Sequence, residues 1–592
     1  MKNRSLFFAV ALCLTVVGCS KNKTNPSKIW YAYSTENLIS DWEYFDGDEE
    51  NEMYAKRDNT LRFSCMKNEN EGVQLMITPT RHINSFDFEL PDVSGNSGAI
   101  TKDHFSVSVA YYMNVDFSNE RTANSGYYPD ALIPLYNYKF RRMNYIDKGR
   151  SQALYINLKT DKNTPSGEFK GTGKLHLDNE VIDVPFEVKI FDATLPDEVH
   201  QVSSFGIWYD QIVNGEKGNS GEQMNMNYYN FLVEKRVTPK ELPPELTNTF
   251  DSFIDNYVEK VVRNEKITSH CLPITLYNCS QTNVNLLLQK MITKNIELIN
   301  AGEESINLFK KAYFYIDDEP TAATFDEVRT HDKIIFEAKK TLSNQLDSWP
   351  EIKYSFTHIP NIVTREYQEE MVATEENGGI ECWCPQMQYF QTPESRELYR
   401  ARQNSTDREY GEHVWWYTCI DPVSPYPNYH LDANMMYSRV LRYMQYDYQI
   451  DGMLFWNVCY YSKYSRGFTL PRDLWNDPIS WELCASDGVL VYPGYNFGIN
   501  GPITTLRLES ILASNEEYEY LWMIEQKVNE YNAIHGESYV ANTLLNKYYS
   551  RLFTNMVAEL DVENFEEVRL ELLSLIETLY RDIDAGMALL TK

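Results

Sequence analysis

Three consecutive carboxylic acids, Asp317, Asp318 and Glu319, follow directly on an aromatic segment in the stretch AYFYIDDEPTAATFDEVR, residues 312–329. Adjacent carboxylates raise one another's pKa, so one can stay protonated as a general acid while its neighbour is ionised. Cleavage of a glycosidic bond needs this division of labour. The competing interpretation is structural, because an aspartate at a strand end is often a turn residue or an ion-pair partner.

The residues after the acids narrow the set of candidates. Pro320 disfavours a helical conformation at the residue before it, which predicts an extended backbone for Glu319. Thr324 and Glu327 form a T-x-x-E pattern, which predicts a capping box and the start of a helix. The candidate catalytic acids are therefore residues 317–319.

The acids lie in a region, from about 200 to 505, in which short apolar or aromatic runs alternate with helical stretches. The predicted strands are SSFGIWYD, SHCLPIT, AYFYID, KYSFTH, GIECWC, HVWWYT, GMLFWN and GVLVYP. Unbroken apolar runs are typical of parallel strands that are covered on both faces. About eight such units predict a (β/α)8 TIM barrel over residues 197–505, with its active site at the C-terminal ends of the strands. The acids would lie at that end.

The region before the predicted barrel has a different periodicity. ALYINLKT and VPFEVKIF alternate apolar and polar residues, and turn signals such as NTPSGEFKG separate the runs. This pattern predicts an antiparallel β-sandwich over residues 30–196. Residues 506–592 are predicted to be helical, so the fold class is multidomain α/β. One helical face there carries an apolar stripe, which we expect to pack on the barrel: Phe565, Val568, Leu572, Leu575, Ile576 and Leu579.

The N-terminus, MKNRSLFFAVALCLTVVGCSKNK, has a basic start, an apolar run that ends at Val17, and then Gly18-Cys19. The run is too short to span a bilayer as a stable helix and fits a signal peptide over residues 1–18. TVVGC resembles a bacterial lipobox, which implies that Cys19 is lipidated and becomes the first residue of the mature chain. We therefore expect a lipoprotein of a Gram-negative-type bacterium, anchored to the membrane and facing the periplasm or the cell exterior, with residues 19–29 as a tether. A simple secreted form is the alternative.

Composition restricts the partners. The 55 basic and 85 acidic residues give a net charge of −30, which disfavours binding to nucleic acid or to an anionic membrane surface. Aromatic residues make up 14% of the chain, including 43 Tyr and 11 Trp. Such a content suits a neutral oligosaccharide or glycoconjugate substrate, although large aromatic cores explain it equally well.

The sequence predicts no cofactor and no metal. It has no Gly-rich phosphate loop, nucleophile-elbow serine or zinc-protease motif. The spacing of its 10 cysteines matches neither a disulfide framework nor a zinc module. Cys382 and Cys384 are two residues apart on a predicted strand and so point to one face, where we interpret them as buried thiols.

Aromatic residues at the predicted strand ends can form the walls of a sugar subsite. The candidates are Trp383, Trp416, Tyr417 and Trp456. Because side chains alternate along a strand, about half of these rings must instead face the helices. Trp416 and Trp456 are the better wall candidates. His270 and His358, each near a predicted strand end, could hydrogen-bond a sugar hydroxyl or belong to the core.

Several separated stretches occur in an order that spans nearly the whole mature chain. They are NEGVQLMI, GYYPDALIPL, TPSGEFKGTGKL, FDATLP, YIDDEP, IECWCP, GEHVWWYTCIDPVSPYPN, IDGMLFWNVCYY, DGVLVYPG and LRLESILASNEEYEYL. The first four resemble the N-terminal sandwich of glycoside hydrolase family 123 and its uncharacterised relatives. The others resemble the barrel of that family and its C-terminal edge.

The resemblance implies a retaining β-N-acetylgalactosaminidase with a (β/α)8 catalytic domain and substrate-assisted catalysis. In that family the 2-acetamido oxygen of the sugar attacks the anomeric carbon. By resemblance, Asp318 would orient the acetamido N–H, and Glu319 would protonate the leaving oxygen and then activate water. A tyrosine hydroxyl would contact the acetamido oxygen, and the candidates are Tyr417, Tyr209 and Tyr354.

The sequence departs from the family at one position, because Cys271 stands after His270 where a basic residue is usual. This departure leaves the identity of the sugar open. Two other functions therefore remain in view. One is a glycosidase of different sugar specificity on the same barrel, and the other is a non-catalytic surface glycan-binding lipoprotein. The intact acid pair argues against the second.

Overall fold

The structure is a computed structural model, and it describes residues 27–41, 57–120, 123–219, 221–405 and 412–592. Cys19, the predicted signal peptide and most of the predicted tether lie outside the described residues. Among the helices of the described part, none is both long enough and apolar enough to cross a membrane.

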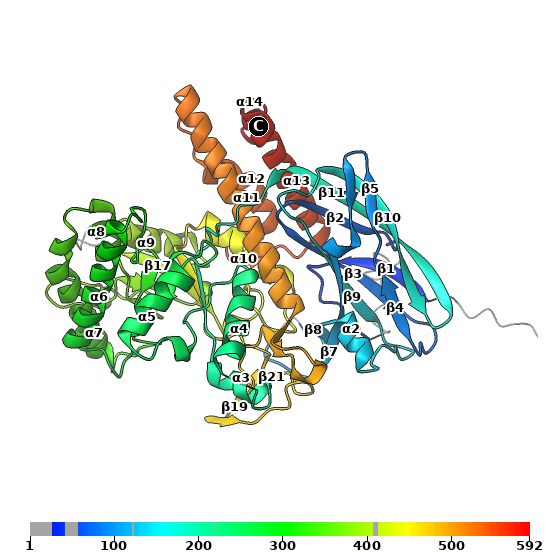
Figure 1. The fold of residues 1–592 in the computed structure, drawn as a ribbon, viewed down its shortest axis with the longest axis horizontal. Coiled ribbons are helices and arrows are strands. Elements are labelled where there is room, and N and C mark those ends of the chain that lie inside the picture. The colour runs from blue at the N-terminus through cyan, green and yellow to red at the C-terminus, as the bar shows by residue number, and fades with distance from the viewer. Residues whose placement is uncertain (1–26, 42–56, 121–122, 220, 406–411) are drawn as a thin grey trace, which may run out of the picture.

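Two β-sheets form the N-terminal part of the molecule (Figure 1). The first is antiparallel, with strands in the order β1 (Lys28–Tyr33), β3 (Asn70–Thr78), β9 (Gln152–Lys159), β7 (Phe105–Val115) and β8 (Gly126–Pro134). The second has the order β2 (Leu61–Lys67), β11 (Glu180–Thr194), β10 (Gly167–Leu177), β5 (Val93–Gly95) and β6 (Gly98–Ile100), with β4 (Phe86–Glu89) also paired to β10.

The two sheets face each other across an aromatic core. Phe63 of β2 lies 5.6 Å from Phe105 of β7, and Phe105 lies 5.5 Å from Phe186 of β11, measured between ring centroids. The alternating residues of ALYINLKT and VPFEVKIF are buried as predicted. The prediction of a purely antiparallel sandwich is wrong in one respect, because β2 and β11 pair in parallel.

The middle of the chain builds a parallel sheet with helices between its strands. The strand order is β12 (Ser203–Phe205), β18 (Gly452–Phe455), β17 (His413–Thr418), β16 (Cys382–Trp383) and β15 (Ile362–Val363). A parallel pair, β13 (His270–Cys271) and β14 (Ala312–Tyr313), is linked to β15 by a bridge between Phe314 and Asn361. The helices of this part include α4 (Glu222–Glu234), α5 (Phe250–Tyr257), α6 (Gln281–Asn300), α7 (Phe325–Leu342), α9 (Pro393–Gln403) and α10 (Met436–Asp447). This is a multidomain α/β architecture, and the closed eight-stranded barrel stays a prediction.

Two of the predicted parallel strands are wrong. KYSFTH belongs to helix α8 (Pro350–Thr357), and the strand that follows is the two-residue β15. GVLVYP contains β23 (Val491–Pro493), which pairs antiparallel with β24 (Pro502–Thr504) outside the parallel sheet. The reason is that a short apolar and aromatic run does not by itself distinguish a parallel strand from a buried helix or a hairpin strand.

The capping box predicted before α7 is also absent. The helix does begin at Phe325, directly after Thr324. However, the Thr324 hydroxyl bonds to the carbonyl of Thr321 at 3.1 Å instead of capping the helix.

The C-terminal region is mainly but not only helical. It contains α11 (Leu506–His535), α12 (Ala541–Leu552), α13 (Val562–Arg581) and α14 (Ile583–Leu590), together with a short hairpin of β25 (Phe553–Thr554) and β26 (Val557–Ala558). The predicted apolar stripe of α13 is buried. Helix α13 packs on β2 and β11 of the N-terminal sheets, where Arg569 donates to the carbonyl of Ser64 at 2.9 Å.

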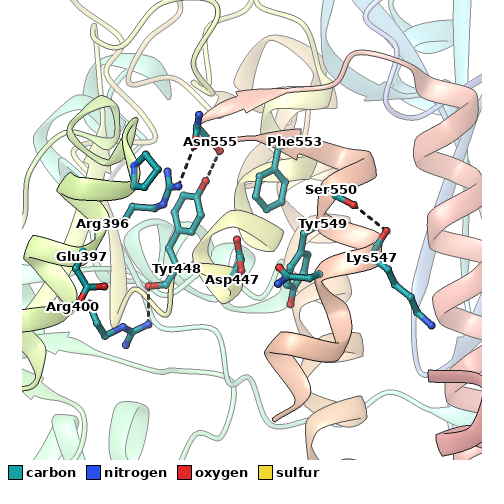
Figure 2. Close-up of a pocket in the computed structure, with 12 residues that line it drawn as sticks. Arg396, Glu397, Arg400, Asp447, Tyr448, Lys547, Tyr549, Ser550, Phe553 and Asn555 are labelled. Carbon is teal, nitrogen blue, oxygen red and sulfur yellow. Dashed lines mark hydrogen bonds between the residues drawn. The ribbon is translucent and has the colours of Figure 1, made fainter. Parts of the chain in front are cut away.

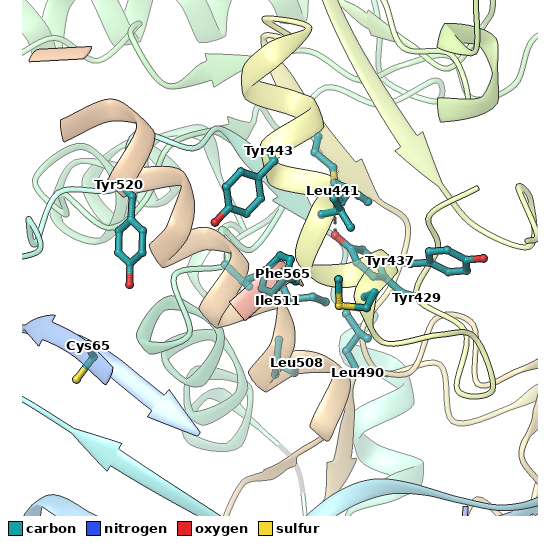
Figure 3. Close-up of a cluster of buried hydrophobic side chains, with 14 of the residues drawn as sticks. Cys65, Tyr429, Tyr437, Leu441, Tyr443, Leu490, Leu508, Ile511, Tyr520 and Phe565 are labelled. Atoms are coloured by element: carbon teal, nitrogen blue, oxygen red, sulfur yellow. Dashed lines mark hydrogen bonds between the residues drawn. The ribbon is translucent and has the colours of Figure 1, made fainter. Parts of the chain in front are cut away.

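One hydrophobic cluster joins these three parts. Figure 3 shows Leu508 and Ile511 of α11, Leu441 of α10 and Phe565 of α13, which belong to the same cluster. A buried ion pair adds to this connection, because Arg507 of α11 bonds to Asp130 of β8 at 2.8 Å. The N-terminal sheets are therefore part of the support for the region that carries the candidate site.

Candidate active site

A pocket of about 300 Å³ opens at the carboxyl ends of the parallel strands. Asp318 and Glu319 line it just beyond β14, as predicted for the acids at this strand end. The other lining residues come from the ends of neighbouring strands and from a later insertion: Trp208, Lys240, Tyr315, Thr364, Tyr417, Cys419, Ile420, Leu454, Phe455, Trp456, Trp481 and Asp487.

Asp318 receives two hydrogen bonds on one of its oxygens. The Tyr315 hydroxyl donates to Oδ1 at 2.7 Å, and the Thr364 hydroxyl donates to the same atom at 2.8 Å. No described residue hydrogen-bonds to Oδ2. The carboxylate is thus fixed through one oxygen, while the other remains available to a ligand in the pocket.

Glu319 is held through both its backbone and its side chain. Its N–H donates to the Thr364 hydroxyl oxygen at 2.6 Å, and its Oε1 accepts from the Tyr417 hydroxyl at 2.6 Å. Its φ is +42°, in the left-handed region, so the extended conformation predicted from Pro320 is wrong. A non-glycine residue in this region costs on the order of 1–3 kcal/mol, and such strain persists where surrounding contacts over-determine the backbone. The two hydrogen bonds supply contacts of that kind.

The tyrosines that hold the acids are protonated donors. Burial first, then the nearby Cys419, and then the hydrogen bond to Glu319 raise the pKa of Tyr417 far above its ordinary value. Burial and the charge of Asp318 raise the pKa of Tyr315 in the same way. Each phenol therefore keeps its proton and donates it to a carboxylate oxygen.

Asp317 points away from this pair. Its carboxylate is only 8% exposed and lies 3.0 Å from Nδ1 of His331 on α7. This ion pair accounts for Asp317 as a structural residue. Of the three consecutive acids, Asp318 and Glu319 are the two that line the pocket.

The His331–Asp317 pair predicts a pH-dependent contribution to stability. The hydrogen bond to Asp317 raises the pKa of His331, against the effect of burial. A histidine whose pKa is raised on folding stabilises the protein below its unfolded pKa of about 6.5, and the stabilisation is lost as pH rises through the folded value. We expect His331→Gln to lower Tm most near about pH 6 and least near about pH 9. A Tm difference that grows with pH in thermal unfolding scans would contradict this assignment.

Trp456 lines the pocket, as does Tyr417 among the other predicted wall residues. Its Nε1 donates to Oδ2 of Asp487 at 3.0 Å, and its ring packs edge-on against Trp208 and Trp481 at 5.6 and 5.5 Å. Gly488 makes this placement possible, because a Cβ there would lie 2.3 Å from Cζ2 of Trp456 and its φ is +73°. Trp208 is 43% exposed, so part of this aromatic wall is open to a ligand.

Lys240 supplies the one cationic side chain among the lining residues. Its Nζ lies 3.8 Å from the ring centroid of Tyr315 and 3.9 Å from Oε1 of Glu241. The pocket thus combines apolar rings, three hydrogen-bonded acids and an ammonium group, a combination suited to a polar ligand with apolar faces.

Three predicted binding residues do not line this pocket. Trp383 and Trp416 have no exposed surface and lie in the main hydrophobic core, where Trp416 packs on Phe390. His270 is 1% exposed and packs against the rings of Phe253 and Tyr257, and burial lowers its pKa to about 3.

Strand alternation explains these placements. Trp415 and Tyr417 point with Cys382 and Cys384 into one interior cluster. Trp416 and Trp383, the residues between them, point to the opposite face of the sheet and are buried in the main hydrophobic core. The prediction that the two cysteines share a face and are buried thiols is confirmed. The prediction of Trp416 as a wall residue is wrong, because its side chain lies on the face of the strand opposite to the one that carries Tyr417.

The rival tyrosines and the second histidine also lie elsewhere. The Tyr209 hydroxyl donates to the carbonyl of Glu241 at 2.9 Å. Tyr354 is 64% exposed on α8 and stacks on His358, with centroids 3.8 Å apart. Of the three tyrosines considered, Tyr417 is the one that reaches an acid of the pocket.

Sequence reasoning missed most of the other lining residues of the pocket, among them Trp208, Lys240, Tyr315, Thr364, Trp481 and Asp487. Trp208 had a usable signal, since it is an aromatic residue near the C-terminal end of the predicted strand SSFGIWYD. Thr364 was missed because its strand was placed at KYSFTH, several residues too early. Trp481 lies on β21 (Ile479–Trp481), and both it and Asp487 follow the last parallel strand, where no pattern predicts an approach to the pocket.

A larger pocket, of about 670 Å³, lies between α9 and α12 (Figure 2). Arg396 there donates to Asn555 at 3.0 Å, and its guanidinium lies 4.7 Å from the ring centroid of Tyr448. Burial raises the pKa of Asp447 to about 6, but no second carboxylate is bonded to it. The paired acids make the smaller pocket the candidate active site. Within the described residues, no group of three or more His, Cys, Asp or Glu side chains is arranged to hold a metal ion.

Comparison with known proteins points to a family of enzymes. The family model described as "Glycoside hydrolase 123, catalytic domain" matches residues 275–524, less than half of the chain. The matched range includes both acids and every lining residue of the pocket except Trp208 and Lys240. This match supports a glycosidase. A search of curated proteins found no match.

Solved structures add evidence on the fold. A family 123 glycoside hydrolase from Clostridium perfringens, from a structural analysis of glycolipid glycan hydrolysis, aligns with a TM-score of 0.61 at 12% identity. The alignment covers 95% of this chain and 99% of that one, so the two share an overall fold. A β-glucuronidase from Parabacteroides merdae aligns with a TM-score of only 0.26 at 9% identity, over 84% of this chain and 65% of that one. That likeness is too weak to support a conclusion.

Proposed function

We propose that the protein is a retaining glycoside hydrolase that releases β-linked N-acetylgalactosamine from glycans by substrate-assisted catalysis. The observation that carries this proposal is the pair of adjacent acids, Asp318 and Glu319, each held by its own tyrosine at the wall of one pocket. The match of the surrounding residues to a glycoside hydrolase 123 catalytic domain supports the same reaction class.

The geometry suits a mechanism in which the enzyme supplies no nucleophile. Oδ2 of Asp318 accepts the acetamido N–H, which orients the acetamido oxygen for attack on the anomeric carbon. As that C–O bond forms, the bond to the leaving oxygen breaks, and Glu319 transfers its proton to that oxygen. Glu319 then takes a proton from water, which attacks the anomeric carbon and reopens the oxazolinium ring with overall retention.

Asp487 is the other carboxylate of the pocket, and it is poorly placed to act as a nucleophile. It is 1% exposed, its Oδ2 accepts from Trp456, and burial raises its pKa. A nucleophilic carboxylate needs an ionised oxygen that is open to the anomeric carbon. We therefore assign Asp487 to the support of the aromatic wall.

The same proposal includes the surroundings of the site. The parallel segments are proposed to form a (β/α)8 barrel, supported by the bridge from Phe205 to Pro239 and by the pairing of β12 with β18. Residues 30–196, 197–505 and 506–592 are proposed as its sandwich, catalytic and C-terminal regions. We further propose that Cys19 carries a lipid that anchors the protein to the membrane, in the periplasm or at the cell surface.

The test is hydrolysis of 4-nitrophenyl β-N-acetylgalactosaminide, measured beside the β-N-acetylglucosaminide and the β-galactoside. We expect activity on the first alone. Substrates with mono-, di- and trifluoroacetamido groups should then be hydrolysed progressively more slowly, because fluorine withdraws electrons and lowers the nucleophilicity of the acetamido oxygen. Activity on the plain galactoside, or rates that do not respond to fluorination, would overturn the assisted mechanism.

A further inference from the structure

Thr364 lies between the two acids and bonds to both of them. A hydroxyl group has one proton to donate and two lone pairs that accept. The Glu319 N–H can only donate, so the Thr364 oxygen accepts at 2.6 Å. Its proton then remains for Oδ1 of Asp318, at 2.8 Å. One side chain therefore ties the backbone of one acid to the carboxylate of the other.

The position of Thr364 protects these bonds. It directly follows β15, the strand beside the β14 segment that leads into the acids, and it is 3% exposed. Water therefore competes little for its hydroxyl. Because both of these bonds are internal, the hydroxyl is engaged by the acids and is not presented to a ligand, even though Thr364 lines the pocket.

The bond to Glu319 acts where the backbone is least favourable. Glu319 adopts φ +42°, which L-residues avoid, and its N–H bond to Thr364 fixes that conformation from the neighbouring strand. The backbone conformation sets the direction in which the Glu319 side chain leaves the main chain. In this conformation the carboxylate reaches the Tyr417 hydroxyl on β17, on another strand.

The bond to Asp318 decides which oxygen remains for a ligand. Tyr315 and Thr364 both donate to Oδ1, from two directions, so the carboxylate cannot turn without losing one of them. Oδ2, which has no partner among the described residues, is thereby kept toward the pocket. An orienting carboxylate must hold such a position closely, since a displacement of about 1 Å at a reacting group can cost about 10²-fold in rate.

We propose that Thr364 is a positioning residue that sets the geometry of Asp318 and Glu319 together, an inference that rests on the proposed function of these acids. The side chain acts through the acids and does not itself contact the reacting atoms. A positioning role requires a hydroxyl group at residue 364, whereas a role in packing alone would require only the shape of the side chain.

The experiment compares Thr364→Val, which keeps the shape and removes both hydrogen bonds, with Thr364→Ser, which keeps the hydroxyl. On 4-nitrophenyl β-N-acetylgalactosaminide we expect the valine variant to lose about 10²-fold in kcat with KM little changed, and the serine variant to stay within several-fold of wild type. The Tm of each variant reports any general destabilisation. A valine variant with wild-type kcat, or a serine variant that loses as much as valine, would overturn the proposal.

Crystal structures of the wild type and the valine variant make the test independent of the substrate. We expect the Glu319 backbone to leave the left-handed region and the Asp318 carboxylate to rotate in the variant. If both acids keep their positions, the inference about Thr364 is wrong, whatever the activity. If the wild type hydrolyses none of the three glycosides while the acids move as expected, the proposed function fails and the positioning role stands.

Discussion

Glu319→Gln is expected to lower kcat on a β-N-acetylgalactosaminide with a poor leaving group, such as an alkyl alcohol, by about 10²–10⁴-fold. The leaving oxygen of such a substrate must be protonated as its bond breaks, and glutamine has no proton to give. The substitution preserves the shape of the side chain, and its amide oxygen can still accept from Tyr417. The loss should therefore come from the chemistry and not from a collapsed site.

A comparison of substrates with different leaving groups distinguishes a general-acid role of Glu319 from a structural role. A 4-nitrophenolate departs without protonation, so the bond-breaking step of the variant should be much less impaired with the 4-nitrophenyl glycoside than with the alkyl glycoside. Glu327→Gln, an exposed acid on α7, is the matched control and should leave both rates unchanged. Equal losses on the two substrates in Glu319→Gln would contradict a role as general acid.

The location of the acids was predictable because several local signals agreed. An aromatic strand, a run of carboxylates and a proline predict a strand end with a presented acid, and the pocket is found there. The choice within the run was not settled by local residue types. Asp317 and Asp318 have identical side chains, and only the tertiary partner His331 distinguishes the structural acid from the one that lines the pocket.

The backbone conformation of Glu319 could not be predicted from the neighbouring residues in the sequence. Pro320 disfavours a helical conformation at the preceding residue and biases it toward an extended one, yet Glu319 adopts a left-handed conformation. That choice follows contacts with Thr364 and Tyr417, which lie 45 and 98 positions later in the chain. No window of neighbouring residues contains this information, and an outlier of this kind is expected where strain is part of a functional site.

The aromatic residues show a related limit. Alternation predicts that neighbouring rings on HVWWYT point to opposite faces, and they do. It does not say which face is the interior, because that depends on how the strand sits in the sheet. Thr364 and Lys240 were harder still, since short strands such as β15 contain too few residues to show any period.

Asp318→Asn is expected to lower kcat on β-N-acetylgalactosaminides by about 10²–10³-fold, a loss typical of a removed charge-stabilising group. The expected cause lies in the two donors to Oδ1. Tyr315 and Thr364 both point protons at that position, so the amide oxygen of asparagine must occupy it. The amide NH2 then takes the place of Oδ2 and presents protons to the acetamido N–H of the substrate. The variant would thus replace an attraction by a repulsion at the group that has to be oriented.

This cause gives Asp318→Asn a kinetic signature unlike that of Glu319→Gln. Because leaving-group protonation is intact, the loss should be similar on alkyl and 4-nitrophenyl glycosides. Asp317→Asn is the neighbouring control: it weakens the ion pair with His331 and should lower Tm while leaving kcat within a few-fold. On the 4-nitrophenyl glycoside, whose leaving group needs no proton from Glu319, adding Thr364→Val to Asp318→Asn should cost little further activity, because residues that act through one group are not additive. Independent, multiplying losses in the double variant would mean that Asp318 and Thr364 do not act on the substrate through the same carboxylate.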